Sequence, residues 1–357
     1  MTHAPHLTRR HLLGLAGSAA AAAAFSRLAL GADNPHAQHA HPVAASSADF
    51  ALDAQRWALP TPQKIKLAVN LNAVCLAPVT VANTQGIFRQ HNLDVEFVNF
   101  GNSTEVLLES LATNKADAAI GMALRWLKAL EQGFDVKLTA GTHGGCLRLI
   151  TQESGPQTFE ALKGQTIGVT DMASPDKNFF SLLLKRHGVD PVRDVSWRTY
   201  PIDLLGTALE KGEIQAASGS DPIMYRLGNQ PGMRELSTNL AEEYANLSCC
   251  VVGVSGTLAR KQKPVAAAIT HSILQAHVWA SQHPEVVAQQ FLKIALNTTA
   301  EEVNAILNQH THAHYSVGNA FTREIAVYAK DLKTVEVLRA STDPLKFAES
   351  IHADVFS

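Results

Sequence analysis

The sequence is short of charge, of cysteine and of long apolar runs. Only 17% of its 357 residues are charged, and 30 lysines and arginines against 32 aspartates and glutamates leave a formal net charge of -2. Without a basic excess, the composition gives no indication of nucleic-acid binding. Four cysteines are too few for a scaffold built on disulfides, and no apolar run reaches the roughly 20 residues of a membrane-spanning helix.

The sequence also lacks the short motifs of common enzyme classes. It has no glycine-rich phosphate loop, no HExxH helix and no GxSxG turn. The nearest approach to a catalytic pair is Cys146 with His143, a thiol near a base. Side chains three positions apart on an extended segment usually face opposite sides, which argues against that pair. We therefore expect no enzyme, with a thiol-dependent periplasmic enzyme or a sensor as alternatives.

The first 32 residues have the layout of an export signal. Arg9 and Arg10 follow Thr8 and precede an apolar run of roughly 14 residues, too short to span a bilayer. The arginine pair indicates the twin-arginine variety of signal. Residues 33–63, rich in alanine, proline and histidine, then predict a flexible tether.

Histidines cluster twice in the sequence, between residues 36 and 41 and as His310, His312 and His314 in the stretch HTHAHY. Alternate residues share a face only in an extended segment. No carboxylate or cysteine in either stretch completes a set of metal ligands. Neither stretch therefore supports a metal site, although His36, His39 and His41 could bind a divalent metal ion loosely.

Strand and helix patterns alternate from residue 64 to about residue 247. Strands separated by helices predict right-handed βαβ units in mostly parallel sheets. The pattern restarts past the GGC turn and the expected strand 147–151, which predicts an α/β fold of two lobes with extra helices at the C-terminus. The expected strands are 65–71, 93–100, 116–122, 136–142, 147–151, 166–170, 195–200, 214–218 and 248–255.

Helix-capping residues follow three of the expected strands. Asn102 is expected to cap the first of these helices, with Glu105 reaching back. Ser174 and Asp221 each precede a proline, which suits the first position of a helix. A helix N-terminus presents unpaired N–H groups and partial positive charge, so three of them at one cleft would suit an anionic group.

Several stretches, taken in their order and spacing, carry a resemblance to a known family. They are GIF (86–88) followed by LDVE (93–96), LATNKADAAIGM (111–122), LKGQTIGVT (162–170), GEIQAASGSDP (212–222) and WASQHPE (279–285). Over residues 64 to about 340, the chain resembles the nitrate/sulfonate/taurine class of ABC-transporter solute-binding proteins. The resemblance implies a two-lobed periplasmic-binding-protein clamshell of type II, preceded by the signal peptide and the tether.

The resemblance also implies domains, partners and a location. Lobe 1 would comprise residues 64–148 and 250–357, and lobe 2 residues 149–249. The protein would be a periplasmic monomer that closes on a small-molecule solute without chemistry, and without a metal or cofactor. It would deliver the solute to the permease and ATPase subunits of an ABC importer in the inner membrane.

Carried over by position, the ligand-binding residues come from loops at the ends of strands in both lobes. Most of them would act through backbone groups. They are Asn72, Cys75, Asn102, Ser103, Thr104, Met122, His143, Asp171, Ser174, Asp221 and Tyr225.

Cysteines fall at both expected crossings between the lobes, Cys146 at the first and Cys249 with Cys250 at the second. Because such crossings lie side by side in this fold, a disulfide from Cys146 to Cys250, or to Cys249, would stiffen lobe closure. Buried free thiols, a functional thiol, or a metal site with His143 and Cys75 remain alternatives.

The charges near the expected cleft favour a zwitterionic solute. Lys177, Arg125 and Arg226 are the basic groups, whereas Asp171 and Asp221 would repel a simple anion. We predict a small organic sulfonate or related zwitterion, with its acidic head on a helix N-terminus and its amine on a carboxylate. A nitrate-like oxyanion, or an uncharged heterocycle such as a thiamine-precursor pyrimidine, is the alternative.

Overall fold

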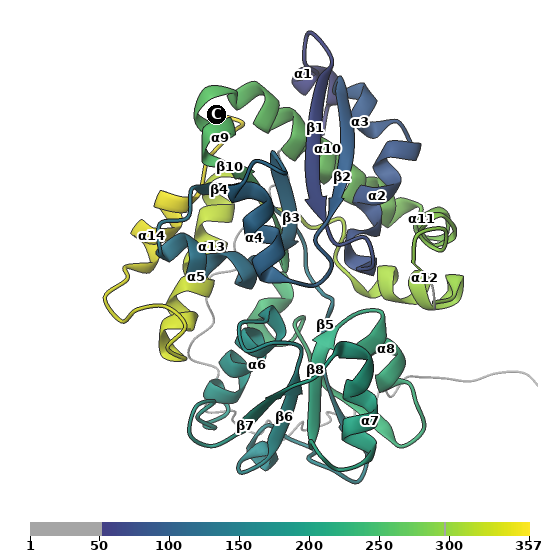
Figure 1. The fold of residues 1–357 in the computed structure, drawn as a ribbon, viewed down its shortest axis with the longest axis vertical. Coiled ribbons are helices and arrows are strands. Elements are labelled where there is room, and N and C mark those ends of the chain that lie inside the picture. Colours follow the sequence, from purple (N-terminus) through teal and green to yellow (C-terminus); the bar gives the residue numbers. More distant parts are fainter. Residues whose placement is uncertain (1–51, 296–297) are drawn as a thin grey trace, which may run out of the picture. The chain divides into compact units, whose positions relative to one another are not determined.

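Two separate β-sheets organise the part of the chain that the computed structural model describes, residues 52–295 and 298–357 (Figure 1). The first sheet has the strand order β2-β1-β3-β10-β4, and the second has the order β7-β6-β8-β5-β9. The strands of the first sheet are β1 (Gln63–Val69), β2 (Leu93–Asn99), β3 (Ala118–Met122), β4 (Val136–His143) and β10 (Cys250–Ser255). Those of the second are β5 (Leu147–Gln152), β6 (Thr166–Val169), β7 (Ser196–Thr199), β8 (Ala216–Ser220) and β9 (Met233–Thr238).

Helices fill most connections between strands and form most of the chain after β10. Up to β10 they are α1 (Ala54–Trp57), η2 (Val74–Leu76), α2 (Ala77–Thr84), α3 (Ile87–Gln90), α4 (Thr104–Ala112), α5 (Ala123–Glu131), η3 (Glu160–Leu162), α6 (Pro175–Arg186), η4 (Ile202–Leu204), α7 (Leu205–Glu210), α8 (Ile223–Gly228) and η5 (Glu242–Asn246). After β10 they are α9 (Gly256–Lys261), α10 (Lys263–Gln282), α11 (Pro284–Phe291), α12 (Ala300–Gln309), α13 (Gly318–Thr334) and α14 (Pro344–Ile351). None of the helices in the described ranges is long and apolar enough to cross a membrane.

Each sheet mixes parallel and antiparallel pairs. In the first, β1 is parallel to β2 and β3, whereas β10 is antiparallel to β3 and β4. In the second, β6 is parallel to β7 and β8, whereas β5 is antiparallel to β8 and β9. The parallel pairs joined through helices are confirmed, but the expectation of mostly parallel sheets is wrong. The reason is that β5 and β10 each enter a sheet directly after crossing from the other, and so run against their neighbours.

Two elements differ from the sequence expectation. β9 was not expected, because it is an edge strand whose residues are mostly half-exposed and form no apolar run. α1 lies within the predicted tether, where Trp57 packs edge-on against Phe356 with ring centroids 4.9 Å apart. The end of the predicted tether is therefore part of the fold. The predicted export signal, residues 1–32, and the tether up to residue 51 lie outside the described residues.

The main hydrophobic core includes the first sheet and the helices α5, α10 and α13. Trp126 of α5 is fully buried, and its ring lies over Gly253 in β10. A Cβ atom on Gly253 would stand 3.0 Å from Trp126 Cη2, so the strand needs glycine there for the ring to pack. This packing holds the first turns of α5 against β10.

Two crossings join the sheets, residues 144–146 between β4 and β5, and residues 239–249 between β9 and β10. They lie against each other, since Cys249 N donates to His143 O over 2.6 Å. Gly145 has a φ of +98°, and a Cβ there would come within 2.6 Å of His310 Cδ2, so the first crossing requires glycine. The division into independent lobes near these crossings stays a prediction.

Candidate functional site

A small cavity lies where strands of the first sheet end. Its volume is about 10 Å³, room for about one water molecule. Of the predicted site residues, Cys75 and Met122 line it. The full lining is Asn70, Ala73, Cys75, Leu76, Phe100, Gly121, Met122, Arg125 and Cys250.

Arg125, in the first turn of α5, is the cation of this cavity. It is 5% exposed. Its Nη1 donates to Asn102 O over 2.8 Å and to Thr104 Oγ1 over 2.7 Å, and its Nη2 donates to Asn102 Oδ1 over 2.6 Å. These acceptors are all neutral, and no carboxylate within the described ranges forms a salt bridge with Arg125. The buried guanidinium therefore has neutral partners only.

Two carboxyl groups of the second sheet's loops act on Arg125 through space. Burial lowers the pKa of Arg125, and the charges of Asp176 and Asp171 act in the opposite direction. Asp176 is buried and accepts a hydrogen bond from Ser218 Oγ over 2.7 Å, while burial raises its pKa. Positive and negative groups thus lie near each other across the two sheets.

The helix caps at these loops follow the prediction in part. Ser174 Oγ accepts from Lys177 N and caps α6, which begins at Pro175, as expected. The prediction for Asn102 is wrong, because Ser103 caps α4 by accepting from Val106 N over 3.2 Å. Asn102 instead accepts hydrogen bonds from Arg125, a contact that no local sequence pattern predicts.

Asp221 is not a helix cap either, because α8 begins after Pro222 without a side-chain cap. Asp221 accepts from Arg148 Nε over 2.7 Å and from Arg148 Nη2 over 3.0 Å, and its Oδ2 lies 3.2 Å from His310 Nε2. Burial acts to lower the pKa of Arg148, but the contacts with Asp221 and then with Glu235 outweigh it and raise this pKa. The Arg148 guanidinium lies 5.1 Å from the ring centre of Tyr225. The predicted residues Asp221 and Tyr225 therefore belong to one ion-paired network.

All four cysteines of the sequence lie in the described part of the chain, buried and free. The predicted disulfide from Cys146, to Cys250 or to Cys249, is not formed in this structure, where the Sγ atoms of Cys146 and Cys249 are 3.4 Å apart. The first crossing reaches Cys249 because residue 249 lies directly against His143 at the end of β4.

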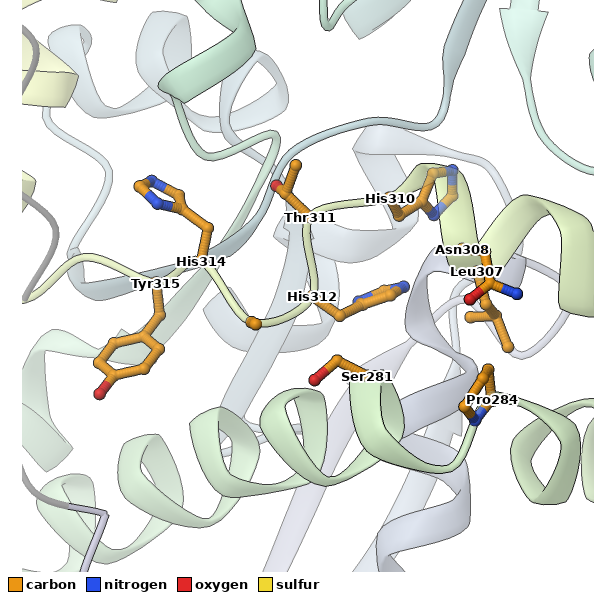
Figure 2. Close-up of a pocket in the computed structure, with 10 residues that line it drawn as sticks. Ser281, Pro284, Leu307, Asn308, His310, Thr311, His312, His314 and Tyr315 are labelled. Carbon is orange, nitrogen blue, oxygen red and sulfur yellow. The ribbon is translucent and has the colours of Figure 1, made fainter. Parts of the chain in front are cut away.

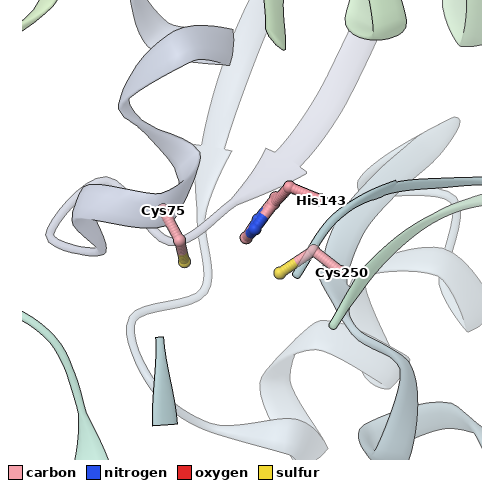
Figure 3. Close-up of side chains that lie close together, drawn as sticks. All are labelled: Cys75, His143 and Cys250. Atoms are coloured by element: carbon pink, nitrogen blue, oxygen red, sulfur yellow. The ribbon is translucent and has the colours of Figure 1, made fainter. Parts of the chain in front are cut away.

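Cys75, His143 and Cys250 converge from η2, the end of β4 and the start of β10 (Figure 3). One donor atom of each lies within 4.8 Å of the others, a spacing that a metal ion could bridge. Hydrogen bonds from Cys146 and then Cys250 lower the pKa of Cys75, whereas burial raises the pKa of Cys250. Burial acts to lower the pKa of His143, but the contact with the Cys75 thiol outweighs it and raises this pKa.

His143 belongs to a second cluster, with His277 of α10 and His312 of the α12–α13 connection. All three are buried, and one nitrogen of each lies within 4.8 Å of the others. The Nδ1 atoms of His277 and His312 are 2.9 Å apart. Burial lowers the pKa of both well below the ordinary value.

A larger cavity, of about 650 Å³, opens beside this cluster (Figure 2). It lies between the α12–α13 connection and the end of α10. Three of its lining residues are the histidines of the HTHAHY stretch, for which the sequence predicted no role. Its lining is Ser281, Pro284, Leu307, Asn308, His310, Thr311, His312, Ala313, His314 and Tyr315.

The structure thus divides the predicted site residues between different places. Asn102, Thr104, Cys75 and Met122 surround or line the Arg125 cavity, whereas Asn72 is exposed, its N–H donating to Asn70 Oδ1. Asp171 turns back on its own loop, its Oδ1 accepting from Ala173 N over 2.6 Å. His277 was not among the predicted site residues, because it stands in an ordinary helix pattern with no neighbouring ligand.

Solved structures with the same fold are similar to this chain at low identity. The periplasmic aliphatic sulphonate-binding protein SsuA of Escherichia coli has a TM-score of 0.67 at 14% identity, over 81% of this chain and 92% of that chain. The alkanesulfonate-binding protein SsuA of Xanthomonas axonopodis pv. citri, bound to MOPS, has a TM-score of 0.67 at 15% identity, over 81% and 99%. The periplasmic nitrate-binding protein NrtA of Synechocystis PCC 6803 has 0.66 at 13%, over 82% and 86%.

These matches confirm the predicted type II periplasmic-binding-protein fold, with two mixed five-stranded sheets and helices. No curated protein is significantly similar to the chain in sequence. A family model described as NMT1/THI5-like matches residues 74–287, more than half of the chain. The chain therefore belongs to the NMT1/THI5-like family.

Proposed function

We propose that the protein is the solute-binding component of an ABC importer, and that it takes a small organic sulfonate or related zwitterion without converting it chemically. The proposal rests on the surroundings of Arg125, a buried guanidinium whose hydrogen-bond partners are all neutral. A buried charge without a counter-charge is costly, and ligand recognition is a common reason to keep one.

The geometry of Arg125 suits an anionic head group. Its three hydrogen bonds use three of its five N–H groups, which leaves Nε–H and one Nη2 hydrogen for another acceptor. Two donors of a guanidinium match two oxygens of a sulfonate or carboxylate. The N-cap of α4 adds partial positive charge at the same place, because Thr104, the first residue of that helix, binds Arg125.

Carboxylates on the other side favour a zwitterion over a simple anion. Asp171 and Asp176 form no salt bridge within the described ranges, and both act on Arg125 electrostatically. An ammonium group of the solute would neutralise one of them while its sulfonate neutralises Arg125. The Xanthomonas relative was solved with MOPS, which is a zwitterionic sulfonate.

Binding would require the two sheets to separate and close again. A cavity of about 10 Å³ does not admit a sulfonate. Only the two crossings connect the strands of one sheet to those of the other along the chain, and such short segments serve as hinges in domain closure. We expect an open form in which Arg125 and Asp171 are both accessible.

The proposed location and partners follow from the same assignment. Two of the similar structures, from Escherichia coli and Synechocystis, are described as periplasmic. We propose the same compartment here, reached through the twin-arginine signal expected in residues 1–32. The permease and ATPase of the importer would be the protein partners.

Calorimetric titration with taurine, methanesulfonate, nitrate and a thiamine-precursor pyrimidine tests the proposal. We expect taurine to bind most tightly, and Arg125→Gln to weaken it at least about 30-fold, as for loss of a buried charged hydrogen-bond partner. Arg260→Gln is the matched control, because Arg260 is exposed and pairs with Asp135 at the surface.

Recovery of the bound compound unchanged, checked by mass spectrometry, tests binding without chemistry. Tight nitrate or pyrimidine binding with no response to taurine would replace the sulfonate by one of the alternatives. Taurine affinity unaffected by Arg125→Gln would remove Arg125 from the site.

A further inference from the structure

Three imidazoles meet in the protein interior away from Arg125. His143 ends β4, His277 is in α10 and His312 is in the α12–α13 connection. Their ring centroids are 4.8 to 5.1 Å apart in each pair, and each residue is at most 1% exposed. Because these residues are distant in the sequence, only the tertiary fold brings them together.

Each of the three rings has a nitrogen, Nε2, with no hydrogen-bond partner in the described part of the chain. Buried polar atoms are almost always satisfied, so three unsatisfied nitrogens in one place indicate a missing ligand. His143 Nδ1 lies 3.0 Å from Gly144 O, and must donate to it. The lone pair of His143 is therefore on Nε2, in the arrangement by which a carbonyl orients metal-binding histidines.

The spacing of the nitrogens suits one metal ion. Ligand nitrogens at about 2.0–2.1 Å from a tetrahedral ion stand about 3.4 Å from each other. One nitrogen of each ring lies within 4.8 Å of the others. The Nδ1 atoms of His277 and His312, 2.9 Å apart, are hydrogen-bonded to each other, while the Nε2 atoms of both rings have no partner among the described residues. Rotation of these two rings would exchange their mutual hydrogen bond for bonds to an ion that His143 Nε2 also binds.

A second set of donors, Cys75 and Cys250 with His143, competes for the same imidazole. Access favours the imidazole set. His312 lines the cavity of about 650 Å³, whereas the two cysteines line the cavity of about 10 Å³. An ion entering from the larger cavity meets imidazoles before thiols.

We propose that His143, His277 and His312 bind a divalent first-row transition metal ion of the zinc type, for which imidazole is a preferred ligand. Three protein ligands leave a fourth position. His310, whose Nδ1 also has no partner, stacks on His143 at a centroid distance of 5.8 Å and is the nearest imidazole outside the set. The ion would tie the end of β4 to α10 and to the α12–α13 connection, whichever solute the protein binds.

Cobalt(II) titration of the full chain tests the site, since tetrahedral cobalt absorbs in the visible and a thiolate ligand adds a charge-transfer band in the near ultraviolet. We expect one tightly bound cobalt ion per chain and no thiolate band. X-ray absorption of the zinc-loaded protein should show nitrogen and oxygen ligands without sulfur. This second measurement needs no variant.

Variants separate this site from other histidines and from the cysteines. His277→Gln and His312→Gln should each weaken cobalt binding more than about 100-fold, beyond the loss expected from disturbing a mere orienting partner. His271→Gln should leave it unchanged, because His271 is a buried histidine of the same helix that contacts His91 instead. Cys75→Ser and Cys250→Ser should also retain binding.

Three results would overturn the proposal. They are a thiolate band that disappears in Cys75→Ser, binding that disappears when the tether histidines between residues 36 and 41 become alanine, and no stoichiometric binding by the wild-type chain. If His277→Gln does not fold, His312→Gln and the ligand count of the wild-type protein still decide.

Discussion

Arg125, in the first turn of α5, and Arg148, near the start of β5, are both buried, one beside each sheet, yet their surroundings differ. Arg148 is 6% exposed and lies between Asp221 and Glu235, with Tyr225 beneath its guanidinium. Arg125 is 5% exposed and contacts neutral oxygens only. Carboxylates thus pair directly with Arg148, whereas Arg125 has no salt-bridge partner in the described part of the chain. The contrast is consistent with a structural role for Arg148 and supports the proposal that Arg125 binds the solute.

The largest expected effect is on stability, from Arg148→Met. The variant leaves Asp221, whose side chain is fully buried, without its main counter-charge, so we expect the free energy of unfolding to fall by about 3–5 kcal/mol. Urea unfolding measures it. Arg148→Met with Asp221→Asn should recover part of the loss, because the uncompensated charge is then removed. A loss below about 1 kcal/mol would show that Arg148 is not structural.

The next effect concerns how α5, which carries Arg125, is held at its other end. Glu131 accepts from Arg339 N over 2.8 Å, pairs with Lys128 at 3.0 Å and accepts from Thr342. Burial acts to raise the pKa of Glu131, but these contacts outweigh it and lower the pKa to about 2.

A carboxyl group with a lowered folded-state pKa stabilises the protein above its unfolded pKa of about 4.5 and loses that effect as the pH falls toward 2. Glu131→Gln should therefore cost at most about 3 kcal/mol at pH 7, and the difference from wild type should vanish between about pH 4.5 and pH 2. Unfolding curves across this range check it. A difference independent of pH would assign the loss to packing instead.

Arg125→Met should have a smaller effect on stability than Arg148→Met or Glu131→Gln. This variant is the sharpest test of the difference between Arg125 and Arg148. It removes a buried charge that has no carboxylate partner, so we expect the free energy of unfolding to change by less than about 1 kcal/mol. The same urea experiment serves, and Arg148→Met is its reference. A loss as large as that of Arg148→Met would mean that Arg125 also holds the fold together.

The smallest expected change is at the crossings. Mild oxidation should link Cys146 to Cys249 and not to Cys250, because the first pair of Sγ atoms is already 3.4 Å apart. Peptide mapping by mass spectrometry identifies the bond. The matched variants are Cys249→Ser, which should prevent it, and Cys250→Ser, which should not. A Cys146–Cys250 bond would contradict this choice between the two predicted partners of Cys146.

Local pattern predicted much of the fold. Apolar runs separated by helical stretches placed most strands within a few residues, and Ser174 with the proline after it marked the start of α6. Such signals are readable because helix periods and caps depend on residues close in sequence. The polar edge strand β9 and the helix α1 at the end of the tether were not predicted, since neither has an apolar run.

The site could be predicted only in part. The sequence identified Asp221 and Asn102 as polar groups at strand ends, but the helix-capping roles expected for them were wrong, because each binds an arginine from another element. Arg125 was recognised as a nearby cation without any indication that it would be buried and unpaired. Its neighbours come from α4 and from the second sheet.

The sequence by itself determined the α/β class, the repeat of two strand-helix sets, and the position of histidine and cysteine at the chain's crossings. These features follow from composition and short-range spacing. Only the tertiary structure decided which of them meet: His277 with His143 and His312, and Cys146 with Cys249. Such contacts join residues more than thirty positions apart, and they depend on how sheets and helices pack rather than on any local preference.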